Sequence, residues 1–258
     1  FVGTHLVSFL KNQGAEVIGI SRKDRQYSED VTNLESIRKY FTDVYAVFHL
    51  ASDALVESGQ EKPYETLKNT ILGALNILEL SRLFKVQKII IASTSQVYGT
   101  SDDKFKESDN PKPTSPYETS KTCVDIIAQS YADSFGLPVL IPRFTNIYGP
   151  GDLHFDRLIP KTIKAVLEHK NPTMWGGRAT RSYLYIDDAV RVYDTLGRLS
   201  VNEMGENRIY NFASNSAFTV EQVIAKIIAL MHSTVSIVKI DDVRKGEAVT
   251  QILNTDKA

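Results

Sequence analysis

The pattern of apolar and polar residues divides the chain into short apolar runs that alternate with longer stretches of helical period. The runs are nearly continuous, as in 88–93, where three isoleucines follow one another. Such runs predict strands buried on both faces, which is typical of a parallel sheet covered by helices. The predicted strands are 16–21, 44–51, 88–93, 138–143 and 208–213, and the predicted helices are 3–13, 34–41, 63–84, 115–135, 156–169, 187–199 and 219–231. The pattern therefore indicates an α/β protein.

The regular alternation loosens after Arg143. A turn-rich stretch at 146–152 and a connection at 175–181, rich in glycine and arginine, interrupt it. We expect a smaller lobe here, set on the carboxyl ends of the strands, where open α/β sheets bind ligands. The predicted boundary lies between 145 and 146, and a segment at about 182–215 is expected to return to the first part.

The composition is that of an ordinary globular protein and narrows the possible partners. Lys+Arg is 30 and Asp+Glu is 31, for a net charge of −1, so neither nucleic acid nor an anionic membrane is expected as a partner. The sequence contains no apolar stretch long enough to span a membrane and no visible signal peptide, so we expect a cytoplasmic protein. The single cysteine, Cys123, excludes an internal disulfide and a thiolate cluster, and no metal site is expected.

Both ends of the chain read as positions inside a longer protein. Residues 1–10 have the pattern of the middle of an element, with no initiator methionine and no preceding strand. Residues 254–258 end without a terminating signal. We expect a fragment that is cut at both ends.

Tyr117 and Lys121 form the first candidate for chemistry. They lie four residues apart at the start of the predicted helix 115–135, so both fall on one helix face. A tyrosine titrates near about pH 10, and a nearby ammonium favours the ionised phenol, which suits acid–base work. An ordinary surface helix with a stacked pair gives the same spacing, and the spacing alone leaves both interpretations open.

Two further stretches have the positions of a ligand cleft. Gly3 precedes a helix and then a strand, as does the last glycine of a dinucleotide-binding turn, where it allows close approach of helix and strand. Ser21, Arg22 and Lys23 end that strand, and cations there favour NADP over NAD; a simple turn and a solvated basic loop are the alternatives. Hydroxyl groups at 93–99 follow a buried strand directly and can reach a sugar hydroxyl or the phenol of Tyr117, unless they form a plain turn.

Together these pieces resemble the extended short-chain dehydrogenase/reductase family, and more narrowly its nucleotide-sugar epimerases and dehydratases. The resemblance runs over essentially the whole chain. It rests on the joint order of Phe1-Val2-Gly3, Asp30-Val31, His49-Leu50-Ala51-Ser52, Asn69, Asn76-Ile77-Leu78-Glu79, Ser93-Thr94, Val97-Tyr98-Gly99, Ser115-Pro116-Tyr117, Ser120-Lys121, Arg143, 146–151 and 181–188. It implies a Rossmann-type doubly wound parallel sheet with a smaller α/β substrate lobe.

The resemblance also implies roles for individual residues. Tyr117 would be the catalytic base, Lys121 would bind the nicotinamide ribose and lower the pKa of the phenol, and Thr94 would hydrogen-bond the reacting hydroxyl. The other implied cofactor residues are Gly3, Ser21, Arg22, Asp30, Val31, Leu50, Ala51, Ser52, Asn69 and Ser93, and the implied substrate residues are Ser95, Gln96, Asn146, Arg157, Arg181 and Arg244. Residues 1–145 would bind the dinucleotide and 146–258 mainly the nucleotide-diphospho-sugar, with NAD as cofactor, NADP as the alternative, and a homodimer built from the helices carrying Leu75 and Tyr117.

Two departures from the family pattern bear on the reaction. The first strand and the glycine-rich turn are missing from the sequence, which affects the pyrophosphate cradle. Ser95 and Gln96 stand where most 4,6-dehydratases carry an acid and a base, and elimination of water needs such a pair. A 4-epimerase needs none, and we therefore favour an epimerase.

Other residues keep the alternatives open. Residues 121–127, Tyr131, 149–153 and 157–160 are most similar to the CDP-glucose 4,6-dehydratase branch. A sugar-nucleotide reductase is a third possible enzyme. A non-catalytic binding protein on the same scaffold is the alternative outside enzymes, since a fold does not determine a function.

Overall fold

The computed structural model describes residues 1–22, 27–53, 56–101, 103–176, 179–200, 203, 208–240 and 250–258. Its central element is a parallel sheet built from β1 (Ala46–His49), β2 (Lys88–Ile91), β3 (Ser93–Thr94), β4 (Val139–Phe144) and β8 (Ile209–Phe212). One edge of β4 pairs with β2 and then β3, and its other edge pairs with β8. Strands β1 and β2 are in register from Ala46 opposite Lys88 to His49 opposite Ile91. The carboxyl ends of β1 and β2 therefore lie next to each other.

Successive side chains of the sheet enter two different hydrophobic cores, as the alternation of a strand requires. Ile89 and Ile91 belong to the core on one face, and Ile90 belongs to the core on the other face. All three are 0% exposed, and each such side chain contributes about 1.5–3 kcal/mol relative to an exposed one. The continuous isoleucine run thus reflects helices on both faces of the sheet.

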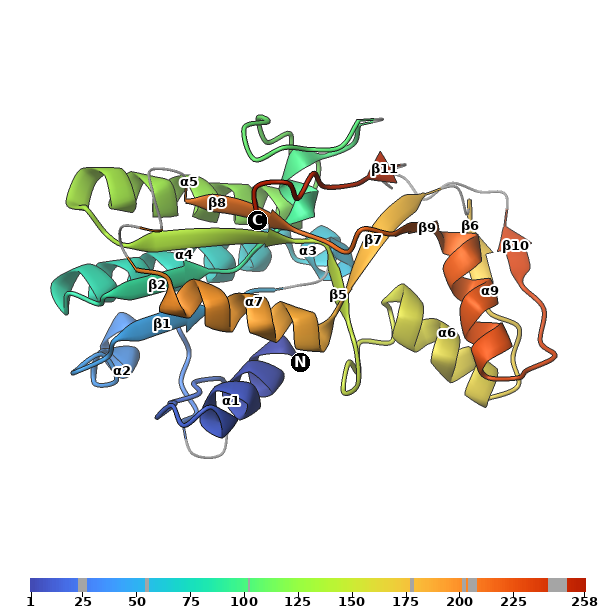
Figure 1. Ribbon diagram of the computed structural model, residues 1–258, viewed down its shortest axis with the longest axis horizontal. Helices are drawn as coiled ribbons and strands as arrows, with labels where there is room; N and C mark the ends of the chain where they lie inside the picture. Colours follow the sequence, from blue (N-terminus) through green and yellow to red (C-terminus); the bar gives the residue numbers. More distant parts are fainter. Residues whose placement is uncertain are drawn as a thin grey trace.

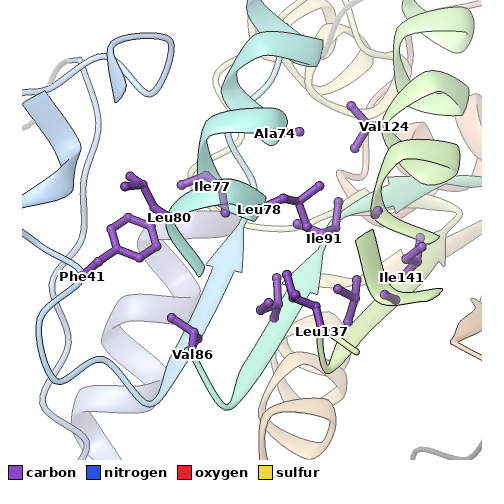
Figure 2. Close-up of a cluster of buried hydrophobic side chains, with 14 of the residues drawn as sticks. Phe41, Ala74, Ile77, Leu78, Leu80, Val86, Ile91, Val124, Leu137 and Ile141 are labelled. Atoms are coloured by element: carbon purple, nitrogen blue, oxygen red, sulfur yellow. The ribbon is translucent and has the colours of Figure 1, made fainter. Parts of the chain in front are cut away.

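Helices α4 (Pro63–Leu83) and α5 (Pro116–Phe135) pack on each other and cover the first face. Figure 2 shows the side chains of this core between the two helices and the strands, including Leu78, Val124 and Ile141. Helices α1 (Val2–Asn12) and α7 (Ile186–Arg198) pack together on the opposite face. Figure 1 shows the two helical layers on either side of the sheet. The doubly wound α/β fold expected from the sequence is confirmed.

A second group of elements lies at one end of the molecule, at the right of Figure 1. Its mixed sheet contains β5 (Asn146–Tyr148), β7 (Thr180–Tyr185), β9 (Ala217–Thr219) and β11 (Thr250–Gln251). A separate parallel pair consists of β6 (Thr173–Trp175) and β10 (Val238–Ile240). Helices α6 (Leu158–Leu167) and α9 (Val220–Leu230) pack against each other beside these strands. Between β7 and β9 the chain returns to the main sheet, where α7 contacts β2 and β8 pairs with β4.

One predicted strand is wrong. The structure describes all of 16–21 but assigns no strand there, and Ile18 is 45% exposed. A strand exists through hydrogen bonds to a neighbouring strand. Among the described residues the backbone contact of this stretch with another segment is one bond, from Ser21 N–H to Tyr27 O at 3.3 Å.

The remaining predicted elements are present, with ends within three residues of the expected positions. Helix α2 (Leu34–Arg38) begins after its N-cap Asn33, at the expected residue, and ends three residues earlier than expected. The sequence did not indicate α3 (Val56–Glu61), nor the short strands β5 and β6 within stretches expected to be loops. Both strands pair with partners far away in the chain, which a local pattern does not reveal.

Candidate active site

Helix α5 begins in a way that places Tyr117 at the edge of the main sheet. Ser115 is the N-cap, its hydroxyl accepts the N–H of Glu118, and the Glu118 side chain accepts the Ser115 N–H in return. This capping box and Pro116 in the first turn fix where the helix starts. Gly136 ends the helix in the left-handed region at φ 67°, as expected for a C-terminal glycine.

The phenol of Tyr117 is buried, with 8% of the residue exposed. Burial is the main influence on its pKa and raises it, while a hydrogen bond with the Thr94 side chain and the positive charge of Arg157 lower it. Thr94 lies at the end of β3, paired with Phe144, and also caps the short 3-10 helix η1 (Ser95–Tyr98). The structure therefore brings the two predicted hydroxyl residues together.

Lys121 lies one turn along α5, and its Nζ donates to the Ala92 carbonyl oxygen at 3.0 Å. Its ammonium is buried, which lowers its pKa to about 8, and the charge of Asp125 opposes that change. The cation that lowers the pKa of Tyr117 is Arg157. This differs from the expectation that Lys121 would do so, because Lys121 points at the end of β2.

A buried ion pair lies one turn further along the same helix face. Asp125 accepts from Arg143 Nε of β4 at 2.8 Å, and their side chains are 1% and 2% exposed. The Arg143 guanidinium stacks over the ring of Tyr98 at 4.7 Å, and Tyr98 donates to Asn211 Oδ1 at 2.9 Å. Tyr117, Lys121 and Asp125 thus form a buried column backed by the sheet.

The residues expected to line the cofactor cleft follow the strands that flank this column. Leu50 and Ser52 are half-buried and Ala51 is exposed after β1, whereas Ser93 is buried next to β2. Asn69 of α4 donates to Asp53 Oδ2 at 3.4 Å, close to the same strand end.

The residues expected near the adenosine form a second group. Asp30 accepts the N–H and hydroxyl of Thr32 at 2.9 and 2.8 Å, and the backbone bond is the main reason that its pKa is lowered. Arg22 Nη1 lies 3.9 Å from Asp30 Oδ2, so this cation already has an acidic neighbour. The Val31 carbonyl accepts from Asn76 Nδ2 at 2.9 Å, while Lys23 lies outside the described residues.

Gly3 lies in α1, and a Cβ added there would have no neighbour within 4 Å among the described residues. The strand that this glycine is expected to approach is missing from the sequence, so the role of Gly3 stays a prediction.

The expected substrate residues that the structure describes lie on η1, β5, β7 and the N-cap of α6. Ser95 is buried in η1, and Gln96 N–H donates to Thr94 Oγ1 at 3.3 Å. Arg157 caps α6 and donates to Asp152 Oδ2 at 3.1 Å. Arg181 of β7 donates to Gln251 Oε1 at 2.9 Å, Asn146 is half-buried at the start of β5, and Arg244 lies outside the described residues.

Three acidic residues at or beside the site were missed. Glu118 could have been found, because Ser115-x-x-Glu118 is the sequence signature of a capping box. Asp125 follows Lys121 at i+4, a spacing that predicts a shared helix face. The role of Asp152 in holding Arg157 depends on the fold of a loop and has no comparable signal.

None of the described helices is both long enough and apolar enough to cross a membrane. Within the same residues, no cluster of three or more His, Cys, Asp or Glu side chains could hold a metal ion.

Comparison with known proteins gives consistent relatives. The profile of the NAD dependent epimerase/dehydratase family matches residues 1–213. The chain is 31% identical to a dTDP-D-glucose 4,6-dehydratase of Dictyostelium discoideum over 88% of this chain and 59% of that protein. It is 30% identical to a UDP-glucuronate 4-epimerase of Thermodesulfobacterium geofontis over 74% of this chain and 67% of that protein. The chain thus spans somewhat over half to two thirds of the length of these relatives.

Solved structures agree with the fold. The UDP-glucose 4-epimerase of Thermotoga maritima with UDP-glucose superposes with a TM-score of 0.89 at 26% identity, over 100% of this chain and 87% of that one. A UDP-glucuronic acid 4-epimerase of Bacillus cereus, in complex with a fluorinated UDP-sugar and NAD, gives 0.90 at 26% identity over 100% and 88%. With residues 1–213 matched by the family profile, the chain belongs to the NAD dependent epimerase/dehydratase family.

Proposed function

We propose that the protein is a nucleotide-diphospho-sugar 4-epimerase that oxidises the sugar transiently at C4 with tightly held NAD, NADP being the alternative cofactor. The observation that carries the proposal is the hydrogen-bonded pair Thr94–Tyr117 with Lys121 one turn away, next to a Ser95-Gln96 pair that has no carboxylate. Curated relatives of the chain include both 4-epimerases and 4,6-dehydratases.

The residues at the carboxyl ends of β1 and β2 fit a dinucleotide. Lys121 offers a buried ammonium at the end of β2, and 50–52 offer a half-exposed wall beside it. Asp30 and Arg22 offer a carboxylate and a guanidinium for an adenosine ribose. Bound NAD would supply hydride transfer, accepting hydride from the sugar carbon and returning it.

Side chains of the protein would transfer the proton of the C4 hydroxyl. Tyr117 would take the proton of the C4 hydroxyl, and Thr94 would hydrogen-bond the same oxygen and orient it. The charge of Arg157 favours the phenolate that this step requires. After the keto sugar turns over, Tyr117 would return the proton to the C4 oxygen as hydride is added to the opposite face of the carbon.

Residues 1–145 would bind the dinucleotide, and 146–258 would mainly bind the nucleotide sugar. Arg157 and Arg181 suit a diphosphate, because the planar guanidinium fits phosphate oxygens. Arg157 is bonded to Asp152 and Arg181 is bonded to Gln251. A bound diphosphate would share or displace these partners. Asn146 would contact the sugar or its diphosphate.

Two other enzyme activities are alternatives. A 4,6-dehydratase is favoured by the Dictyostelium relative and by the likeness of 149–153 and 157–160 to the CDP-glucose branch. It would need an acid and a base near C5 and C6, which Ser95 and Gln96 do not supply. A sugar-nucleotide reductase would use the same tyrosine but would consume reduced cofactor and release it oxidised.

The test is a screen of UDP-, GDP-, CDP- and dTDP-sugars with the purified chain and NAD. We expect turnover of at least one class, and a loss of roughly 100-fold or more in Tyr117→Phe, the range that acid–base catalysis contributes. Unchanged activity in Tyr117→Phe would overturn the role of Tyr117 as the base, and no turnover of any class would favour a binding protein on this scaffold.

The molecule is further proposed to act as a homodimer in the cytoplasm. Leu75 and Leu83 of α4 and Ile126 and Phe135 of α5 are 36%, 45%, 57% and 56% exposed, and two copies could cover them. The single cysteine suits a reducing compartment.

A further inference from the structure

Glu118, the residue after Tyr117, is held more tightly than a helix cap needs. It is only 7% exposed. Its Oε2 accepts the Thr114 N–H at 2.7 Å, the Thr114 hydroxyl at 2.9 Å and the Ser115 N–H at 3.0 Å. A capping box accounts only for the bond to Ser115. The two bonds from Thr114 tie the preceding loop to the first turn of α5.

The backbone of Tyr117 is confined from other sides as well. A Cβ added to Gly59 of α3 would lie 3.2 Å from the Tyr117 nitrogen and 3.4 Å from its Cβ, so α3 packs directly on this turn. The Ser120 hydroxyl donates to the Tyr117 carbonyl at 2.7 Å. Tyr117 is thus fixed between α3 and the hydrogen bonds of Glu118.

We propose that Glu118 is a positioning residue for Tyr117: its carboxylate locks the first turn of α5 and carries a negative charge in that same turn. The proposal rests on the proposed function and deepens it, since it assigns a second role to the carboxylate beyond the helix cap. Gly59 contributes because it has no side chain, which allows α3 to pack against the same turn.

The charges around the phenol set the sign of the expected effect. Burial raises the pKa of Tyr117 most, Thr94 and Arg157 lower it, and Glu118 raises it. Tyr193 of α7 also faces this region, and the pKa of Tyr193 is raised by burial and by Tyr117. Removing the charge of Glu118 should therefore lower the pKa of Tyr117.

A matched pair of variants separates position from charge. Glu118→Gln keeps an acceptor oxygen and loses the charge, whereas Glu118→Ala loses both. We expect Glu118→Gln to retain at least about a third of kcat and to move the acidic limb of the kcat profile down by about half a pH unit. We expect Glu118→Ala to lose on the order of tenfold or more in kcat, with a smaller change in KM.

A purely structural cap predicts a different result. Both variants would then lower Tm, and the acidic limb would stay where it is in the wild type. An unchanged limb in Glu118→Gln overturns the proposal.

Gly59→Ala tests the backbone part without changing a charge. It should lower kcat several-fold by pushing on the Tyr117 backbone, with the acidic limb unmoved. Full kcat in Gly59→Ala would contradict the confinement by α3, and this variant keeps the test open if Glu118→Ala does not fold.

Failure of the proposed function would be recognised separately. If the wild type turns over none of the nucleotide sugars, the effect of Glu118 on the pKa of Tyr117 can still be measured by NMR titration of the tyrosine rings in the full chain. The signal of Tyr117 is identified by its absence in Tyr117→Phe. The Tyr117 signal should titrate at lower pH in Glu118→Gln than in the wild type. Identical titrations would overturn the proposal.

Discussion

At the phenol of Tyr117, burial competes with two charges of opposite sign. Burial and Glu118 raise its pKa, and Thr94 and Arg157 lower it. A base must lose its proton near the working pH to be effective. Arg157, the N-cap residue of α6, is therefore a cation whose loss should be visible in a pH profile.

Arg157→Gln removes this cation and should raise the pKa of Tyr117. Because the base acts when deprotonated, the acidic limb of kcat at saturating substrate should move to higher pH, by about half a unit or more. Arg157→Lys keeps the charge and serves as the control, with its limb close to that of the wild type. A limb that stays in place in Arg157→Gln would mean that Arg157 does not act on the phenol.

Lys121 gives a second prediction, on cofactor affinity. Burial lowers the pKa of its ammonium to about 8, so its positive charge is present below that pH and is lost above it. The affinity for NAD, measured by calorimetry on either side of pH 8, should therefore fall as the pH rises. Lys121→Met should bind NAD weakly and without this dependence, and a flat wild-type profile would speak against Lys121 as a cofactor ligand.

The sequence identified part of this site for physical reasons. Tyr117 and Lys121 are four apart on one helix, and Thr94 follows a buried strand, so local spacing made them candidates and the family resemblance implied their roles. Arg157 lies on a different element, and only the fold brings its charge to the phenol. Glu118 carried a local signature that went unused.

At the level of elements, α5 carries both the proposed catalytic residues and a buried ion pair. Its buried face carries Tyr117 and Lys121, and one turn further Asp125 pairs with Arg143 of β4. Burial raises the pKa of Asp125, and the Arg143 charge opposes this. The pair thus links α5 to the middle of the sheet.

Asp125→Asn should destabilise the fold by about 3–5 kcal/mol, because it leaves the Arg143 charge buried without a counter-ion. Denaturant unfolding measures this directly. The double variant Asp125→Asn/Arg143→Met removes both charges and should recover a substantial part of the loss. Equal stability of the wild type and Asp125→Asn would show that the pair does not hold the helix.

Helices and strands were largely predictable from the sequence where a strand is buried on both faces or where a helix has capping residues. The run 88–93 and the limits of α5 follow directly from apolar continuity and from Ser115 and Gly136. The stretch 16–21 has the same apolar character but has no neighbouring strand among the described residues, so composition alone overpredicted it. Short strands such as β5 depend on partners distant in sequence.

At the level of the whole molecule, the outer faces of α4 and α5 leave apolar side chains in solvent. If two copies associate through them, a charge at this surface should separate the copies. Leu75→Lys/Ile126→Lys should sediment as a monomer, whereas the wild type should sediment as a dimer. Leu230→Lys on the distant α9, where Leu230 is 71% exposed, is the control and should remain dimeric; a monomeric wild type would contradict the proposal.

The two ends of the molecule divide the work in the proposed reaction. The main sheet and α5 position Tyr117 and Lys121, and Arg157 at the N-cap of α6 acts on the phenol through its charge. Reaction type then depends on Ser95 and Gln96 of η1, which provide no carboxylate for elimination.

The most direct test is the identity of the product formed from an accepted nucleotide sugar, analysed by mass spectrometry and NMR. An epimerase predicts a product of unchanged mass with inverted configuration at C4 and no net reduction of the cofactor. A product lighter by one water, with a 4-keto-6-deoxy sugar, would contradict the account and assign the chain to the dehydratases.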